Sequence, residues 1–498
     1  MTRILPPFRS TSALQTALAL AMAVALPAQT PPSPTQRIAT VEQQVLQALI
    51  GFARAAESAK LPSRARVAYE TILEHYDLEN PTARKGLGWK QVKGEWQAPA
   101  AGSLAADAAG PDQRKKVAEA WLLTSRKVAK LHRELGLALR DAGEPALSTM
   151  QLERALTFDP DDIAAHQALG HEQFEGFYGT AEQLAFVQRM RSMLEKAKEL
   201  RAVEPEVKEV PDNKLPSTLQ SVGLRFYGAR SEHFEHWVVD SLPDAMACAQ
   251  WAERAAALGT FLLGPDNPHL LRTSALRWCG CVRDDAQRDL VLEKAPTVRG
   301  KLTLEDAKLF GGLLFDSATG RASMSWHERE TDADHSVATV TKRCLVGGRN
   351  VGFGEGLVHA TTWMLCGTTL SYYCDLPKTQ SGGAKLMPRD PKAWLTRLQD
   401  EIEAGTDYPL VQLARERADN FHESARIKSW SFMLWLLARH PDRWIKLLDK
   451  LSQPNMMPED VTQIFATVME RDLGEIEDEW RAWARRGSRI GKASGFLE

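Results

Sequence analysis

The chain has 498 residues, which is long enough for two or three domains with at least one large hydrophobic core. Apolar residues make up 44% and charged residues 25% of it, as in an ordinary soluble globular protein. The formal net charge is only −2 and no long block carries a single charge, which argues against a protein that binds nucleic acid through overall positive charge.

The N-terminus has the layout of a secretory signal peptide. Arg3 and Arg9 precede an apolar run that ends at Leu26, and Ala28 is a small residue near which a signal peptidase could cut. The run is too short for a comfortable membrane span, although an uncleaved anchor is the alternative. We expect residues 1–28 to be a signal peptide, and the mature chain to be periplasmic or extracellular with no transmembrane segment.

Helical patterns follow a short linker, 29–40. Two stripes of apolar residues at helical spacing, broken at Pro62, predict a helical pair. A small β-hairpin is predicted next, around Lys93-Gly94, so that pair and hairpin together form the region 41–97. The Ala-, Gly- and Pro-rich stretch 98–112 is predicted to be a second linker. The two stripes consist of Val45, Leu49, Phe52, Ala56, Ala65, Ala68, Tyr69 and Ile72.

An internal repeat comes after this linker. Leu135-Gly136 and Leu169-Gly170 lie 34 residues apart, which is the period of a tetratricopeptide unit. The pattern predicts tetratricopeptide-like helical repeats over 113–204, followed by a proline-rich linker, 205–217. Repeats of this kind are interaction scaffolds, and so short an array is also compatible with a spacer. The residues that fit the first unit are Leu139, Gly143, Leu152, Ala155 and Pro160.

The later part of the chain contains all six cysteines. In an exported protein they could form up to three disulfides, whose connectivity the sequence does not reveal. Cys279 and Cys281 share one face of a predicted strand but have no partner at metal-binding spacing, so we interpret the cysteines as core residues or structural bridges. The six are Cys248, Cys279, Cys281, Cys344, Cys366 and Cys374.

The most informative pattern begins at residue 332. His335, Ser336 and Thr339 stand where a His-Glu-x-x-His zinc motif has its first ligand, its general base and its second ligand. Glu355 follows in a Gly-Glu-Gly run, where a second helix would supply a further ligand. A serine cannot serve as a base near neutral pH, and a threonine is a poor zinc ligand, so the motif is degenerate.

These motifs make the region 218–490 similar to the peptidase-MA-like family of gluzincin metallopeptidases, and in particular to exported members with N-terminal helical repeats. The resemblance implies a domain with a small sheet and long helices, in which His335 and Glu355 match zinc ligands. The expected fold class is therefore mainly α with a smaller β part (α+β), with helical repeats ahead of the gluzincin-like domain. Weaker motifs in the family's order are Ser231 to Trp237, Phe310 to Leu313, Ser429 to Phe432 and Asp472 to Trp483.

The number of available ligands argues against catalysis. A catalytic zinc ion needs three protein ligands and an open position for water. His335 and Glu355 supply two, and His359, one helical turn after Glu355, is the only other candidate nearby. We expect no catalytic residues, no bound metal and no other cofactor.

The sequence thus favours an exported, non-catalytic relative of a gluzincin, a pseudoenzyme whose cleft holds a protein or peptide by strand addition. One alternative is an active zinc-dependent hydrolase with an atypical site made of His335, Glu355 and His359. A second alternative is a structural envelope protein that acts through its helical repeats.

The signal-peptide interpretation is directly testable. Residues 1 to about 28 should be absent from the mature protein, because the apolar run and the small residue before Gln29 are typical of a cleaved leader. N-terminal sequencing of the protein recovered from expressing cells should begin near Gln29. A membrane-bound chain that still begins at Met1 would contradict this prediction.

Overall fold

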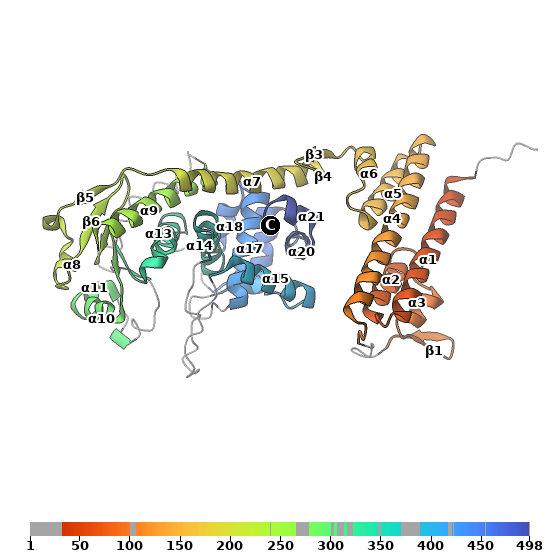
Figure 1. Ribbon diagram of the computed structural model, residues 1–498, viewed down its shortest axis with the longest axis horizontal. Coiled ribbons are helices and arrows are strands. Elements are labelled where there is room, and N and C mark those ends of the chain that lie inside the picture. Colours follow the sequence, from red (N-terminus) through yellow and green to blue (C-terminus); the bar gives the residue numbers. More distant parts are fainter. Residues whose placement is uncertain are drawn as a thin grey trace, which may run out of the picture. The chain divides into compact units, whose positions relative to one another are not determined.

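The computed structural model describes residues 32–99, 106–239, 241–264, 278–299, 303–305, 313–315, 322–346, 350–369, 389–416, 421, 423–453 and 455–497. The predicted signal peptide, Cys374 and most of the predicted glycine turn at 310–313 lie outside these residues. The chain divides into two compact units, Met1–Leu169 and Gly170–Glu498 (Figure 1). The fold class is mainly α with a smaller β part, as the sequence predicts.

The first unit consists mainly of helices, with one small hairpin. Its first half contains α1 (Pro34–Ser58), α2 (Pro62–His75), α3 (Pro81–Gly86) and the hairpin strands β1 (Lys90–Val92) and β2 (Glu95–Gln97). Its second half contains α4 (Pro111–Asp141), α5 (Pro145–Phe158) and α6 (Ile163–Ala168).

The predicted first helical pair and its hairpin are confirmed. All eight residues of the two predicted stripes are buried in one core cluster, because both stripes face the contact between α1 and α2. The helix α1 begins earlier than expected, inside the stretch 29–40 that the sequence assigns to a linker. Ser33 and Gln36 form a capping box, and Pro34 at the first helical position needs no amide partner, so the helix starts there.

The first predicted repeat unit is also present, as the helix pair α4 and α5. Leu139, Leu152 and Ala155 are buried, and Gly143 takes the turn with φ of 80°. Gly136 lets the two helices approach, since a Cβ atom there would lie 2.8 Å from Leu152 Cγ. Leu152 and Ala155 belong to a buried cluster on the α5 side of this contact.

A second helical repeat does not begin at Leu169-Gly170, which corrects the expected array over 113–204. Gly170 has a φ of 72° and leads into a second hairpin, β3 (Glu172–Phe174) and β4 (Phe177–Gly179). Its turn places Glu175 and Gly176 in the left-handed region, where a helix cannot continue. The hairpin packs against α7 (Ala181–Ala202) in the second unit.

The two hairpins show that the N-terminal part of the chain is a duplication with a period of 82 residues (Asn80 to Asp162), not a run of 34-residue repeats. Equivalent residues have equivalent structural roles. In each copy an Asn or Asp caps the short helix, a glycine with positive φ ends it, and two left-handed residues make the hairpin turn. The matched pairs are Asn80 and Asp162, Gly88 and Gly170, Lys93 and Glu175, and Gly94 and Gly176.

The second unit contains a six-stranded mixed sheet with the strand order β5-β6-β7-β8-β10-β9. The pairs β7–β8 and β8–β10 are parallel, and the pairs β5–β6, β6–β7 and β9–β10 are antiparallel. The strands are β5 (Lys208–Val210), β6 (Tyr227–Arg230), β7 (Glu235–Val238), β8 (Trp278–Val282), β9 (Leu313–Phe315) and β10 (Ala322–Trp326).

The stretch 205–217 is therefore not only a linker, because it supplies the edge strand β5. Pro211 ends this strand, and the stretch then forms a 3₁₀ turn, Asp212–Lys214. The predicted strand that carries Cys279 and Cys281 is confirmed as β8.

Helices cover both faces of the sheet. On one face α9 (Leu242–Leu263) packs against β6 and β7. On the other face Trp237 and Met324 join a cluster with α10 (Asp285–Lys294) and α11 (Pro296–Arg299). The short helix α8 (Ser217–Gln220) precedes β6, and Figure 1 shows α7 running alongside α9.

A helical bundle completes the unit. Its two most closely packed helices are α14 (Val351–Cys366) and α17 (Glu423–Arg439), and nearly every residue of α17 is buried. The other members are α13 (Asp332–Val340) with a π-helical extension (Thr341–Val346), α15 (Pro391–Ala404), α16 (Leu410–Leu413), α18 (Trp444–Lys450), α19 (Pro458–Met469), α20 (Leu473–Ala484) and α21 (Arg489–Ala493).

Within the described ranges, no helix combines the length and the apolar character that a membrane span requires.

Five cysteines lie in the described ranges and all five are free thiols. Four of them, Cys248, Cys279, Cys281 and Cys344, are buried. The interpretation as core residues therefore fits these four.

The contact between α4 and α5 can be tested with a pair of matched glycines. Gly136→Ala should destabilise the protein by on the order of 1–2 kcal/mol, because overpacking against Leu152 outweighs the gain in helix propensity. Gly51→Ala, on the exposed side of α1 with open space around it, should stabilise the protein by about 0.5–1 kcal/mol. Urea unfolding followed by circular dichroism measures both. Equal effects at the two positions would contradict the close approach at Gly136.

Candidate functional site

Two adjacent parallel strands bring the candidate site together. Cys281 on β8 pairs with Ser325 on β10, and the amide of His327, just beyond β10, donates to the carbonyl of Val282 at 3.2 Å. Because the strands are parallel, their carboxyl ends lie at one edge of the sheet, where α/β proteins commonly place ligand sites. A short 3₁₀ turn then leads into α13, which begins at Asp332.

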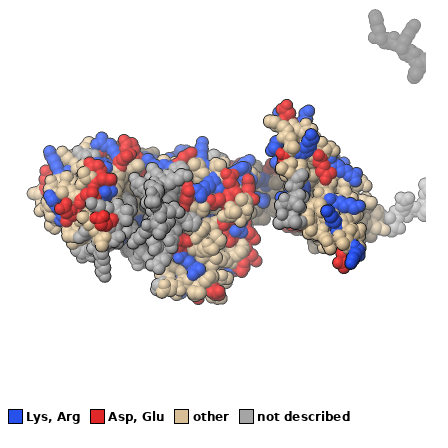
Figure 2. Space-filling model, turned by 90° about the horizontal axis from the view of Figure 1, so that it is seen from below, with Lys and Arg blue, Asp and Glu red and all other residues tan. Residues whose placement is uncertain are grey.

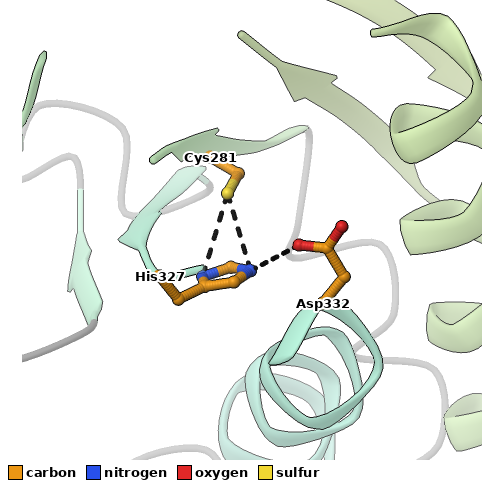
Figure 3. A group of neighbouring side chains, drawn as sticks. All are labelled: Cys281, His327 and Asp332. Atoms are coloured by element: carbon orange, nitrogen blue, oxygen red, sulfur yellow. Dashed lines mark hydrogen bonds and ion pairs between the residues drawn. The ribbon is translucent and has the colours of Figure 1, made fainter. Parts of the chain in front are cut away.

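Three side chains from these elements converge (Figure 3). Cys281 Sγ lies 3.5 Å from His327 Nε2 and 3.8 Å from Nδ1, and the same Nε2 lies 2.9 Å from Asp332 Oδ1. The potential ligand atoms of these three residues all lie within 4.8 Å of one another, and among the described residues no other set of His, Cys, Asp and Glu forms such a group.

The carboxylate of Asp332 is shared with a guanidinium. Arg283, two residues beyond Cys281, donates from Nη2 to Asp332 Oδ2 at 3.0 Å and also contacts Asp244 at 3.4 Å. Burial alone would raise the pKa of Asp332, but its hydrogen bonds with His327 and Arg283 hold the pKa below its usual value. Asp332 is therefore an anion at neutral pH.

The two histidines of the site have opposite electrostatic character. Burial alone would lower the pKa of His327, but its contacts with Cys281 and Asp332 raise it to about 9. Burial lowers the pKa of His335 well below its usual value, and the positive charge of His327 lowers it further. The two rings stack in parallel, with centroids 4.0 Å apart, so a neutral imidazole lies on a charged one.

The contacts of this trio differ from those of a thiol–imidazole–carboxylate relay. In such a relay one ring nitrogen faces the nucleophile and the other faces the carboxylate. Here Cys281 and Asp332 both contact Nε2, and the sulfur lies nearly equidistant from the two nitrogens. The arrangement holds three donors around one point and leaves no separate path for proton transfer.

The positions of the gluzincin-like motif lie in two different environments. His335 is on α13 in contact with His327, and Ser336 on the same helix is buried with its hydroxyl hydrogen-bonded to the Cys248 thiol. Thr339 is buried as well, at 4% exposure, and so are Val337 and Val340 on the same helix.

Glu355 and His359 belong to a second cluster, on α14. Glu355 Oε1 accepts a hydrogen bond from Lys342 Nζ at 2.6 Å, and Arg426 Nη1 lies 3.9 Å from Oε2. Burial alone would raise the pKa of Glu355, but the charges of Lys342 and Arg426 hold it below its usual value. His335, Glu355 and His359 do not form a three-ligand group among the described residues.

Close helix packing fixes the position of Glu355. A Cβ atom on the next residue, Gly356, would collide with the backbone and the hydroxyl of Ser429 on α17. The Gly-Glu-Gly run therefore permits α14 to lie directly against α17, the helix that contains the motif Ser429 to Phe432. His359, one turn later, is fully buried with its ring edge-on to Trp394 at 4.9 Å.

Sequence reasoning missed Cys281, His327 and Asp332 as a group. The sequence predicts Cys281 to be a core residue or a structural bridge and assigns no role to His327 or Asp332. The available signal was their position: a cysteine near the end of one strand and a histidine directly after another. That signal becomes useful only when the two strands are known to be neighbours and parallel.

The buried histidine in the second cluster should make stability depend on pH. Burial first, and then the positive charge of Arg426, lower the pKa of His359 from 6.5 to about 3. The unfolded chain therefore binds a proton more readily than the folded chain, and stability is lost as pH falls from about 6.5 towards 3. Each pH unit in this window costs up to about 1.4 kcal/mol.

His359→Gln removes this titration. Between pH 6.5 and pH 4.5 the free energy of unfolding of the parent should fall by about 2 kcal/mol more than that of the variant. Urea unfolding at several pH values measures the two slopes, and a comparison at pH 8 gives the cost of the substitution itself. Identical pH dependence in the two proteins would show that His359 is not held neutral.

Comparison with known proteins returns no relatives. No family model matches the chain, and neither a curated protein nor a solved structure matches it. The resemblance to the gluzincins therefore stays a prediction that depends on the motifs in the sequence.

Proposed function

We propose that this chain is an exported, non-catalytic relative of the gluzincin peptidases that binds an extended segment of a protein or peptide. The observation that carries the proposal is a groove of about 940 Å³ beside the edge strand β5. The end of α7, the segment 205–211, the end of β6 and one side of α9 line the groove. Its volume is in the range of sites that enclose a short peptide or a small molecule.

Strand addition is the binding mode that this edge favours. Strand β5 pairs with β6 on one side only, so the main chain on its other side is available to an extended partner. Within this strand Lys208 and Glu209 are exposed, whereas the side chain of Val210 is buried in the core. Four acidic and four basic residues line the groove, so recognition would depend on main-chain pairing and shape more than on net charge.

The contacts of the degenerate motif support a role without hydrolysis. Ser336, at the position of the general base, is engaged by Cys248 inside the domain. Glu355, at the position of the downstream ligand, is engaged by Lys342 and Arg426 and belongs to no group of three potential metal ligands among the described residues. These contacts favour a binding protein over the zinc-dependent hydrolase.

The surface charge supports a protein or peptide partner in preference to nucleic acid. On the face shown in Figure 2, Lys and Arg side chains of the described residues are interspersed with Asp and Glu. Nucleic-acid binders commonly gather Lys and Arg on one face instead.

Filling the groove should abolish binding. Ala257 lines the groove from α9 and is partly exposed, so the indole of Ala257→Trp should occupy the groove. The probe is a panel of fluorescein-labelled nonapeptides of mixed sequence, measured by fluorescence anisotropy. Peptides that bind the parent should bind the variant at least tenfold more weakly, which corresponds to about 1.4 kcal/mol.

Ala247→Trp is the matched control, because Ala247 is a partly exposed alanine on the same helix outside the groove. Mass spectrometry of the peptides after incubation tests hydrolysis, and intact peptides are expected. Cleaved peptides, or equal loss of binding in both variants, would overturn the proposal.

A further inference from the structure

We propose that Cys281, His327 and Asp332 form a binding site for one divalent transition-metal ion, with Zn²⁺ as the preferred occupant. This site is separate from the gluzincin-like motif and does not depend on the peptide-binding proposal. It revises the expectation that the chain holds no cofactor, which weighed the motif positions and the Cys279–Cys281 pair but not Cys281 together with His327 and Asp332.

One of the three donor distances already fits a tetrahedral ion, and all three donor atoms lie within 4.8 Å of one another. With Zn–S near 2.3 Å and Zn–N or Zn–O near 2.0–2.2 Å, donor atoms around zinc lie about 3.3–3.7 Å apart. Cys281 Sγ and His327 Nε2 are already 3.5 Å apart. Nε2 and Asp332 Oδ1, at 2.9 Å, would have to separate by about half an ångström, which a small side-chain rotation provides.

The convergence of the donors is the feature that an ion pair alone does not explain. His327 and Asp332 with Arg283 would make a satisfactory buried ion pair without any sulfur nearby. Instead, Cys281 Sγ approaches the same imidazole nitrogen that contacts the carboxylate. A thiol near both nitrogens of the ring, and a carboxylate at one of them, bring three potential metal ligands together (Figure 3).

The neighbouring residues would support the ligands from outside. Arg283 holds both oxygens of Asp332, Oδ2 from Nη2 at 3.0 Å and Oδ1 from Nη1 at 2.5 Å, and Oδ1 also lies 2.9 Å from His327 Nε2. The stacked ring of His335 fixes the plane of the His327 imidazole. Outer contacts of this kind orient metal ligands and tune the affinity of a site.

The elements that carry the ligands are fixed before any ion binds. Cys281 lies on a strand with a partner on each side, and His327 continues the ladder of β10 through its backbone hydrogen bond. Cys281 is 4% exposed and Asp332 is 7% exposed, so little water competes with an ion at this point. Three protein ligands leave a fourth position for water or another donor.

The donor set also selects the kind of metal. Thiolate and imidazole suit Zn²⁺ and similar borderline-soft ions, whereas Mg²⁺ and Ca²⁺ prefer sites made only of oxygen. The thiolate and the carboxylate together balance the two positive charges of the ion. Zn²⁺ is therefore the expected occupant, and Co²⁺ is a suitable spectroscopic probe for it.

The test is a Co²⁺ titration of the full mature chain, purified without a histidine tag, stripped with a chelator and kept reduced. The wild type should bind about one equivalent and develop a thiolate-to-cobalt absorption band in the near ultraviolet. Cys281→Ser and His327→Asn should each weaken binding more than about 100-fold, beyond the cost of losing an outer partner. Cys279→Ser is the matched control, because Cys279 is a buried cysteine on the same strand outside the group.

Glu355→Gln distinguishes this site from the gluzincin-like positions and should leave Co²⁺ binding unchanged. The absence of a saturable band in the wild type would overturn the proposal, as would a loss of binding in folded Glu355→Gln or Cys279→Ser. Where a ligand variant fails to fold, X-ray absorption spectroscopy of the zinc-loaded wild type shows whether a sulfur atom is bound to the zinc ion. One sulfur among the zinc neighbours supports the site, and no sulfur overturns it.

Discussion

The parallel pairing of β8 with β10 is the interaction on which the candidate site depends. Cys281 and His327 are 46 residues apart in the chain. Only the register that pairs Cys281 with Ser325 brings the two side chains together. A shift of one residue would turn Cys281 to the opposite face of the sheet, because side chains alternate along a strand. The clusters on both faces resist such a shift, with Trp278 on one face and Cys281 on the other.

The interior of the second unit contains several charged groups, each engaged by an opposite charge. Asp332 is engaged by Arg283, and Glu355 by Lys342. Lys428, only 1% exposed, lies 2.7 Å from both Asp407 and Glu477 and 3.5 Å from the centre of the Trp480 ring. Buried pairs of this kind add little net stability but are costly to break, so they fix which helices can pack together.

Elements with a strong local pattern could be predicted from the sequence, and elements defined by partners could not. The pair α1 and α2 was predicted with its whole buried face, because the apolar residues repeat at helical spacing over several turns. Strands β5 and β9 have only three residues each, too few for an alternating pattern to stand out. The hairpin at residues 172–179 went unrecognised although its first copy was predicted, since Glu175 replaces Lys93 and Tyr178 replaces Trp96.

In the candidate site, the positions of His335 and Glu355 on two helices were predictable from the motif. The grouping of Cys281, His327 and Asp332 was not, because it requires the strand order.

The hairpin β3–β4 connects the beginning of the second unit to its very end. Strand β4 contacts α21, the guanidinium of Arg489 lies 5.2 Å from the Phe177 ring, and Arg191 on α7 donates to the carbonyl of Ala493 at 2.8 Å. Residues near 177 thus contact partners some 300 positions later, whereas the strands of the first hairpin are largely exposed and Trp96 contacts Arg84 on the neighbouring α3. During synthesis the first unit can complete its core while the ribosome is still making the rest. The second hairpin gains its contacts with α21 only after the last helix has been released, so even a short C-terminal truncation would remove that cover from β4.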